Sequence, residues 1–173
     1  SEEPDSEEDY YGEQYKLRQT DHRHRSVAFR QELVERRFSP QDSEILLSLT
    51  QAFGKTEEWL RRGNGWNGIK VEGGRVTEVD WSRKVASGTI PPIIRGLNSL
   101  TYLNLYGCGL SGNLPPQLGE LRPLQVLILS RNSFTGAVPP SLAQLTNLNS
   151  LDLHANDFST RVPTVAIVQD RLK

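Results

Sequence analysis

The chain has little cysteine and no glycosylation sequon. Cys108 is the one cysteine among 173 residues, so no disulfide can form within the chain. None of the nine asparagines begins the N-x-S/T pattern that accepts a sugar. Small extracellular domains are usually cross-linked by disulfides. Both absences therefore favour an intracellular or organellar compartment, a plastid among them, over the extracellular space.

Methionine and long apolar runs are missing as well. No run approaches the roughly 18 apolar residues of a membrane-spanning helix, so we expect no membrane span. There is no methionine and no basic-then-apolar segment at the start, so we expect any targeting segment to have been removed. The formal net charge is -1, and this balance gives no overall field that would attract nucleic acid or a membrane surface.

Charge is distributed unevenly over residues 1–38, which we interpret as an N-terminal extension. Residues 1–14 hold seven acids and no base, whereas residues 16–37 hold seven Lys or Arg against three acids. The acidic block cannot bury enough apolar surface to offset its ordering entropy, so we expect it to be disordered alone. It would also repel phosphates, so no nucleic-acid partner is expected. In the basic stretch, Phe29, Leu33 and Val34 fall at helical spacing behind Ser26 and predict a short helix.

Two segments have the form of a metal or cofactor site, but each has a simpler interpretation. His22 and His24 could ligate a metal, yet the neighbouring arginines would oppose a cation, and a solvated basic stretch is favoured. Glycines between Gly63 and Gly74 are similar to a phosphate loop, but no Lys-Ser/Thr pair follows them. We interpret them as turns and expect neither a metal nor a small-molecule cofactor.

Residues 39–75 predict a helical cap. Ser39 is suited to cap a helix, Pro40 to its first turn and Asp42 to the positive end of its dipole. One apolar face then follows, formed by Ile45, Leu46, Leu49, Ala52 and Phe53, and Gly54 ends the helix. A second helix start lies at Thr56. Beyond it, three apolar side chains are expected to cover the open end of the array that follows: Trp59, Leu60 and Trp66.

The strongest pattern is a period of 24 residues that runs four times without a shift. The recurring positions are Val76, Leu100, Leu124 and Leu148; Val79, Leu103, Leu127 and Leu151; Trp81, Leu105, Leu129 and Leu153; Ala86, Leu110, Phe134 and Phe158; and Pro91, Pro115, Pro139 and Pro163. A fixed period of this length with the spacing L-x-x-L-x-L indicates an α/β repeat solenoid. We expect residues 76–173 to form four units, each with one short strand and a return path.

The units resemble the plant-type leucine-rich repeat family, whose unit reads L-x-x-L-x-x-L-x-L-x-x-N-x-L-x-G-x-I-P. The second unit reads Leu100, Leu103, Leu105, Cys108, Leu110, Gly112, Leu114, Pro115, and the third reads Leu124, Leu127, Leu129, Asn132, Phe134, Gly136, Val138, Pro139. The convex side continues as Ile94 and Leu97, Leu118 and Leu121, and Leu142 and Leu145. The resemblance covers roughly residues 40–165. It implies a right-handed superhelix with a short parallel β-sheet on the concave side and an N-terminal helical cap.

Several departures from the family pattern are informative. Secreted members carry a Cys-x-Trp-x-Gly-x-x-Cys cap, and the corresponding residues here are Asn64, Trp66, Gly68 and Val71. The repeat asparagine, which in the family bonds backbone groups between turns, is Lys84 in the first unit and Cys108 in the second. We interpret Cys108 as a small packing residue rather than a nucleophile. In the fourth unit Thr160 replaces a glycine, and Ala166 and Gln169 replace convex leucines, so the array either ends here or continues beyond Lys173.

Side chains between the inward leucines are expected to form three columns on the concave sheet. These are Glu78, Tyr102, Val126 and Ser150; Asp80, Asn104, Ile128 and Asp152; and Ser82, Tyr106, Ser130 and His154. Two tyrosines beside Val126 and Ile128 predict an exposed aromatic and apolar patch of the kind enriched at protein interfaces. The alternative is that such residues simply suit a strand surface. The predicted partner-binding residues are Glu78, Asp80, Tyr102, Asn104, Tyr106, Val126, Ile128, Arg131, Asp152 and His154.

No catalytic constellation is predicted. Asp152 and His154 share one strand face and Ser130 could neighbour His154, which is the nearest approach to a Ser-His-Asp set. No pocket or oxyanion donor accompanies them, so we expect no enzyme.

The expected function is a non-catalytic protein–protein interaction module. It would act as an accessory or scaffold subunit of a larger complex, docking partners through its concave face and its N-terminal extension. The resemblance implies two alternatives, a receptor-like ligand-binding domain and an inhibitor of a secreted hydrolase. The missing cap cysteines argue against both.

Overall fold

The computed structural model describes residues 39–62, 65–85 and 87–160. The N-terminal extension with its predicted helix, the histidines His22 and His24, and the end of the fourth unit lie outside these residues. In the described part of the chain, no helix combines the length and the hydrophobicity that crossing a bilayer requires.

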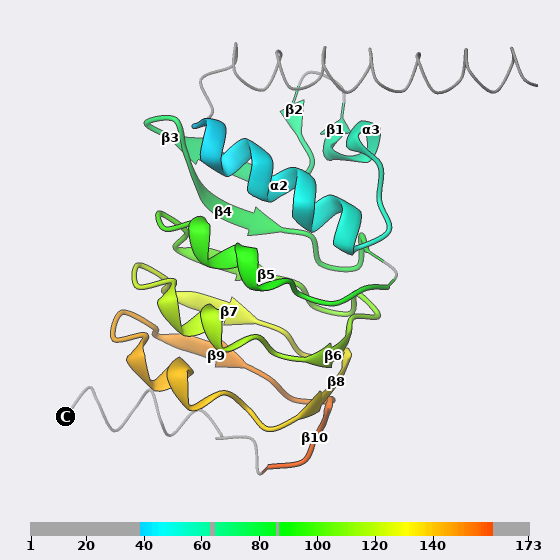
Figure 1. Cartoon of the computed structure of the whole chain (residues 1–173), viewed down its shortest axis with the longest axis vertical. Coiled ribbons are helices and arrows are strands. Elements are labelled where there is room, and N and C mark those ends of the chain that lie inside the picture. Colours follow the sequence, from blue (N-terminus) through cyan, green and yellow to red (C-terminus); the bar gives the residue numbers. More distant parts are fainter. Residues whose placement is uncertain (1–38, 63–64, 86, 161–173) are drawn as a thin grey trace, which may run out of the picture.

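The described residues form a solenoid of stacked turns with helices on one side and a main β-sheet on the other (Figure 1). The cap comprises α2 (Pro40–Ala52), α3 (Glu57–Leu60), β1 (Arg61–Arg62), β2 (Gly65–Trp66) and β3 (Ile69–Glu72). The main sheet continues with β4 (Arg75–Asp80), β5 (Tyr102–Asn104), β7 (Val126–Ile128) and β9 (Ser150–Asp152). The helical side of the turns holds the 3-10 helices η1 (Pro92–Gly96), η2 (Pro116–Glu120) and η3 (Pro140–Gln144).

The main sheet confirms the 24-residue register. Its strand order is β3-β4-β5-β7-β9, and β4, β5, β7 and β9 pair in parallel. Glu78 pairs with Tyr102, Tyr102 with Val126 and Val126 with Ser150. Because side chains alternate along a strand, this one register places equivalent residues of all four units in the same columns.

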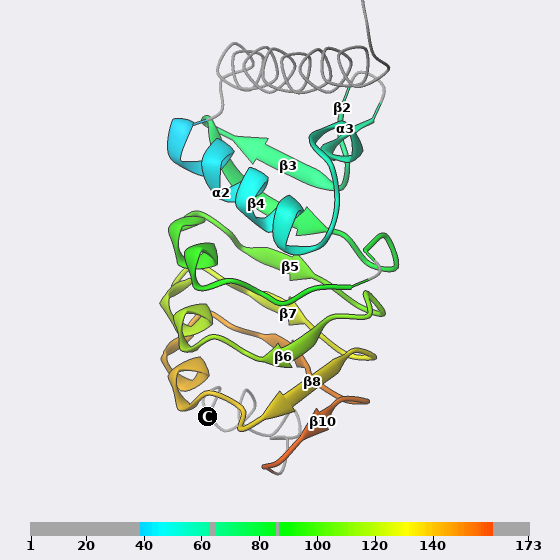
Figure 2. The same ribbon diagram turned by 45° about the vertical axis from the view of Figure 1, so that its right-hand side comes forward.

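Two features of the strands differ from the expectation. The cap is not helical alone, because β3 pairs antiparallel with β4 and adds an edge strand to the main sheet. One strand per unit is also too few, because β6 (Ser111–Asn113), β8 (Ser133–Gly136) and β10 (Asp157–Phe158) form a second, parallel sheet (Figure 2). A segment such as Ser-Gly-Asn has no apolar alternation, so its pairing depends on neighbouring turns that bring equivalent segments together.

The inward columns form one continuous hydrophobic core. Leu105, Leu129 and Leu153 are at most 2% exposed, and Trp81 is fully buried. Each such side chain contributes roughly 1.5–3 kcal/mol of burial free energy relative to an exposed one. A single turn cannot enclose its own leucines, so this energy is available only to the stack.

Each 3-10 helix on the helical side of the solenoid begins with a proline. These residues are Pro92, Pro116 and Pro140. Proline fits there because its φ is already fixed near the helical value and its missing N–H has no partner to lose. Two residues after each of these prolines a side chain enters the core in the first three units: Ile94, Leu118 and Leu142. The convex leucines are therefore placed as the resemblance implies.

Helix α2 begins and ends where the sequence predicts. The Ser39 hydroxyl accepts a hydrogen bond from the Asp42 backbone N–H at 3.5 Å, and Gly54 follows the helix with φ of 62°. Asp42 does more than face the helix dipole. Its side chain is fully buried and binds Arg75 and the backbone N–H of Val76, which joins the cap to β4.

Aromatic side chains seal the cap against the first unit. The rings of Phe53 and Trp59 meet the Trp81 ring edge to face, at centroid distances of 5.8 and 5.3 Å. Leu60 is fully buried beside them, and the Trp81 indole N–H donates to the carbonyl of Asn67 at 2.7 Å. The indole therefore packs among apolar groups without leaving its one polar atom unpaired.

Candidate functional site

The face of the main sheet that is turned away from α2 and the 3-10 helices is its outer face (Figure 1). The predicted partner-binding residues lie on the strands of this sheet or shortly after them. The strand register places Asp80, Asn104, Ile128 and Asp152 in one column, beside the column that begins with Glu78. At the ends of the strands, backbone bonds from Arg83 to Tyr106 (2.8 Å) and from Arg131 to His154 (3.0 Å) continue the stack. The structure thus brings the three predicted columns together, with one correction: Ser130 of the third column is fully buried and not on the surface.

The aromatic and apolar patch spans the middle strands of this outer face. It consists of Tyr102, Tyr106, Val126 and Ile128. Each of these side chains is half-buried rather than fully exposed, because strands about 4.8 Å apart let neighbouring side chains shield one another. Among the described residues the large apolar side chain that is exposed is Ile93, at 42%, and it lies on η1 instead.

Glu78 in the first column is engaged by the cap. The Lys70 ammonium on β3 donates to Glu78 at 2.8 Å and lies 3.0 Å from Glu72. The bonds to Glu78 and then Glu72 raise the pKa of Lys70 above its ordinary value. No sequence pattern indicates this role of Lys70, because the antiparallel pairing of β3 with β4 that brings it here is a tertiary feature.

Asp80 and Asn104 organise the turn that follows their strands. Asp80 Oδ1 accepts from the backbone N–H of Ser82 at 3.1 Å and from its hydroxyl at 2.7 Å, while Asn104 Oδ1 accepts from the backbone N–H of Tyr106 at 3.1 Å. Burial alone would raise the pKa of Asp80, but the bonds from Ser82, with help from Lys84 and Asn104, lower it below the ordinary value. These side chains therefore have a structural function in addition to any contact with a partner.

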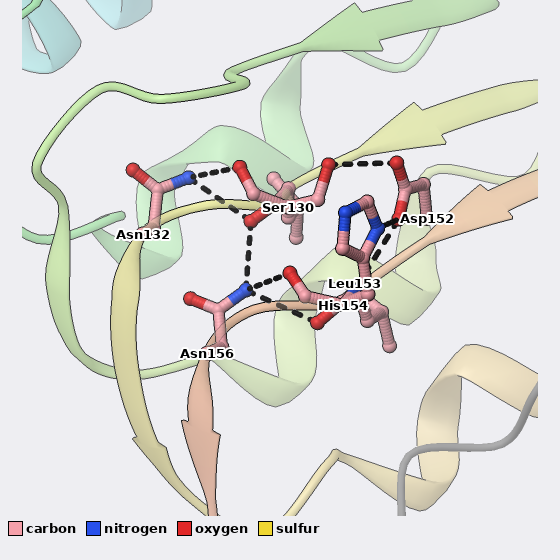
Figure 3. Close-up of polar contacts among 7 residues, drawn as sticks. Ser130, Asn132, Asp152, Leu153, His154 and Asn156 are labelled. Atoms are coloured by element: carbon pink, nitrogen blue, oxygen red, sulfur yellow. Dashed lines mark hydrogen bonds and ion pairs between the residues drawn. The ribbon is translucent and has the colours of Figure 1, made fainter.

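Ser130, Asp152 and His154 meet in a chain of polar contacts (Figure 3). The Ser130 hydroxyl donates to Asp152 Oδ2 at 2.7 Å, and His154 Nδ1 contacts Asp152 Oδ1. Burial raises the pKa of Asp152, but the hydrogen bonds from Ser130 and His154 outweigh it and leave the pKa below its ordinary value. Asp152 is the centre of this group.

This order of contacts does not fit acyl transfer. A catalytic triad needs the serine hydroxyl against the imidazole, with the carboxylate on the far side of the ring. Here Ser130 is fully buried and its hydroxyl donates to Asp152, whereas a triad would require it to donate to His154. Within residues 39–62, 65–85 and 87–160, no group of three or more His, Cys, Asp or Glu is placed to hold a metal ion.

Asparagines behind the site bind the turns together, as the resemblance implies. Asn132 Nδ2 donates to the carbonyls of Leu105 (2.8 Å) and Leu129 (3.0 Å), and its Oδ1 accepts from the backbone of Cys108 and Leu110 (2.9 and 3.0 Å). Figure 3 shows Asn156 making the equivalent bonds one turn later, to Leu129 and Leu153.

The two substituted positions keep part of this function. The buried Cys108 thiol donates to the carbonyl of Trp81 at 3.0 Å, where an asparagine would donate its amide. Burial raises the pKa of the Cys108 thiol, which agrees with a packing residue rather than a nucleophile. Lys84 instead reaches the carbonyl of Asp80 at 3.0 Å.

Arginines flank the patch at the corner that follows the third column. The Arg83 guanidinium lies over the Tyr106 ring, 5.1 Å from its centroid. Arg131 is exposed and follows Ser130 directly. Arg131 is among the predicted partner-binding residues and Arg83 is not. The 24-residue period could have identified Arg83, because it places Arg83, Gly107, Arg131 and Ala155 at one repeat position.

Comparisons with known proteins agree with this geometry. The Leucine Rich Repeat family model matches residues 99–121 and 123–145. No curated protein sequence gives a match. Among solved structures, a chain of the PEPR1–AtPEP1 structure is 27% identical with a TM-score of 0.64, over 73% of this chain and 19% of that chain. This chain therefore spans about a fifth of the length of that relative.

Two further solved structures cover more of both chains. The leucine-rich repeat ectodomain of the receptor kinase SOBIR1 from Arabidopsis thaliana is 26% identical with a TM-score of 0.63, over 77% of this chain and 76% of that chain. A chain of the BIR3–SERK2 complex from Arabidopsis thaliana is 26% identical with a TM-score of 0.55, over 72% of this chain and 68% of that chain.

Proposed function

This chain is a leucine-rich repeat protein of the plant type that lacks the cap disulfide, and we propose that it is a non-catalytic protein–protein interaction module. The observation that carries the proposal is the patch of Tyr102, Tyr106, Val126 and Ile128 on a sheet face that no described helix covers. Aromatic side chains bring large contact area at low entropy cost, and half-buried rings are already ordered before a partner arrives.

The polar residues around the patch support a binding role over a catalytic one. Ser130 is buried against Asp152, and Asp80 and Asn104 fix local turns, so their polar atoms are largely engaged within the chain. Stacked repeats of a solenoid create an extended concave surface of the kind that binds partners. A partner would therefore gain most of its binding free energy from the apolar patch and use the polar rim for register.

We infer further that the module is an accessory or scaffold subunit of an intracellular or organellar complex. The single cysteine and the absence of sequons support this compartment. The unlike charges of residues 1–14 and 16–37 support a second attachment through the N-terminal extension. Deleting residues 1–38 should then release the chain from its complex, and retention of the shortened chain would contradict the anchor.

A receptor-like ligand-binding domain is the second candidate, favoured by a specific similarity. The SOBIR1 ectodomain, part of a receptor kinase, matches over three quarters of both chains. The residues against it are Asn64 and Val71, which stand where secreted members of the family carry the paired cysteines of the cap. A thiol count and the N-terminal sequence of the unprocessed precursor would separate the two candidates, since a secretory signal would favour the receptor.

The interaction surface can be tested by co-purification of the full-length chain. The doubly substituted Tyr102→Ala, Tyr106→Ala chain should lose a partner that the unsubstituted chain retains. Ile93→Ala is the matched control, because it removes an exposed apolar side chain on η1, away from the outer face. Equal recovery of the partner by all three chains would contradict the proposed surface.

A further inference from the structure

The corner of each turn, directly after the third column, adopts an unusual backbone conformation. Arg83, Gly107, Arg131 and Ala155 have φ of 55°, 60°, 54° and 52°. This left-handed region disfavours residues with a side chain and suits glycine. Gly107 shows that the corner itself does not require arginine. An arginine held in a disfavoured conformation at two corners therefore points to a purpose other than forming the turn.

Neither arginine is neutralised by a carboxylate in the described part of the chain. Arg83 contacts the Tyr106 ring, and its Nη2 lies 3.4 Å from the phenol oxygen. The exposed Arg131 side chain makes no hydrogen bond, ion pair or ring contact with residues that the structure describes. For comparison, Arg75 on the same solenoid binds the carboxylate of Asp42 at 2.9 Å.

Acids in the adjacent column are occupied by their own neighbours. Asp80 accepts from Ser82 at 2.7 Å and from Asn104 at 3.4 Å. Asp152 accepts from Ser130 at 2.7 Å and contacts His154. Because these oxygens are engaged by other groups, they do not pair with the two arginines, and an external carboxylate can.

The corners are spaced so that one extended segment can reach both arginines. Backbone bonds from Arg83 to Tyr106 and from Gly107 to Ser130 show that the corners follow the strands. Neighbouring strands are about 4.8 Å apart, so the two arginine backbones are about 10 Å apart. Gly107 leaves no side chain between them. Alternate side chains of an extended peptide are roughly 7 Å apart, a separation that two long guanidinium side chains can accommodate.

We propose that Arg83 and Arg131 bind an acidic segment of the protein partner, with carboxylates on alternate residues and the Tyr106 ring as the floor between them. The inference rests on the proposed function and deepens it by naming the chemistry of the partner. It accounts for the arginines at strained corners, for their missing carboxylate partners and for the glycine between them.

The test uses the full-length chain and a fluorescein-labelled peptide of alternating Gly and Glu, followed by fluorescence anisotropy. A peptide of alternating Gly and Gln is the neutral probe. The Glu peptide should bind more tightly than the Gln peptide and lose affinity as salt is raised. Arg131→Glu should weaken its binding by about tenfold or more. Equal binding of both peptides, or unchanged binding by Arg131→Glu, overturns the proposal.

Two variants separate binding from folding. Arg131→Gly should bind the Glu peptide more weakly than the unsubstituted chain does. Its thermal unfolding midpoint should stay the same or rise, because glycine relieves the strain of the left-handed backbone at this corner. Arg122→Glu should leave peptide binding unchanged, because Arg122 bonds Gln144 on the helical side of the solenoid. A fall in the midpoint of Arg131→Gly that matches its loss of binding would mark the arginine as structural and contradict the proposal.

The chain's own acidic N-terminus is a competing occupant of the rim. Binding that appears only after the seven acids of residues 1–14 are changed to Asn or Gln would assign the rim to this segment and overturn the proposal. If the doubly substituted Tyr102→Ala, Tyr106→Ala chain loses the co-purified partner while Arg131→Glu keeps both the partner and the peptide, the arginine site is overturned and the proposed function stands. Retention of the partner by the tyrosine variant contradicts the proposed function itself.

Discussion

Arg75 holds the fully buried carboxylate of Asp42 through two hydrogen bonds, from Nε at 3.0 Å and from Nη2 at 2.9 Å. The same carboxylate accepts from the backbone N–H of Val76 at 2.8 Å, and Arg75 also donates to Asn98 Oδ1 at 2.6 Å. One buried acid therefore ties the cap helix to the first strand of the array, and the arginine continues the contact to Asn98 near the end of the first unit.

This pair predicts an asymmetric response to substitution. Arg75→Ala should lower the free energy of unfolding by about 3–5 kcal/mol, because it leaves the Asp42 carboxylate buried without a cation. Asp42→Asn should cost less, about 1–3 kcal/mol, because the Arg75 side chain is 31% exposed and can turn to water. Urea denaturation measures both. Lys70→Ala, which breaks exposed ion pairs, is the control and should leave the free energy of unfolding nearly unchanged. Equal losses for the first two variants would contradict the asymmetry.

The asparagine between turns makes a second prediction. Asn132→Ala removes the amide that donates to the carbonyls of Leu105, Leu129 and Ser130. It also leaves the N–H groups of Cys108 and Leu110 without their acceptor. We expect a loss of about 2–3 kcal/mol, measured by thermal or urea unfolding. Asn147→Ala removes one exposed bond to the Arg122 carbonyl and should cost about 1 kcal/mol or less. Similar losses of unfolding free energy at the two positions would show that the buried bonds of Asn132 between turns stabilise the fold no more than one exposed bond.

The close packing of η2 against η3 gives a third prediction. A Cβ at Gly119 would lie 2.4 Å from the backbone oxygen of Ser141, and backbone cannot move as a side-chain end can. Gly119→Ala should therefore cost about 1–3 kcal/mol through overpacking. Its equivalent in the next unit, Ala143, is exposed and already carries a Cβ. Ala143→Gly should change the free energy of unfolding by roughly 1 kcal/mol or less. A neutral Gly119→Ala would mean that the turns can separate at little cost.

Acid titration tests the network at Asp152. Hydrogen bonds lower the pKa of Asp152 in the folded chain. The carboxylate therefore stabilises the fold at any pH above its pKa in the unfolded chain, about 3.9, and this stabilisation is lost as pH falls through the folded pKa. Ser130→Ala removes the main lowering contact while burial still raises the pKa. The pKa of Asp152, followed by NMR, should rise in this variant.

Ser82→Ala provides the matched control, because Ser82 makes the same kind of contact with Asp80 in the first unit. It should raise the pKa of Asp80 and leave that of Asp152 unchanged. The same unchanged titration of Asp152 in Ser130→Ala would show that the hydroxyl is not what lowers its pKa.

Much of the fold follows from the sequence by itself. The 24-residue period predicts which leucines are inward and which residues share a column, because a repeated local pattern forces a repeated local structure. Ser39 and Gly54 likewise mark the ends of α2 through interactions within a few residues. These features are local or strictly periodic, and local rules are sufficient to read them.

Only the tertiary structure decided the contacts between segments that the period does not relate. Asp42 and Arg75, and Lys70 and Glu78, meet because the cap packs against the first strand of the array. The period places Ser130 near the strand of Asp152 and His154, but only the packing decides that its hydroxyl donates to Asp152. The same packing turns Ser-Gly-Asn into a strand, half-buries the tyrosines expected to be exposed, and leaves Arg83 and Arg131 without a described carboxylate. Such contacts join groups whose separation depends on the whole stack, so no local pattern in the chain encodes them.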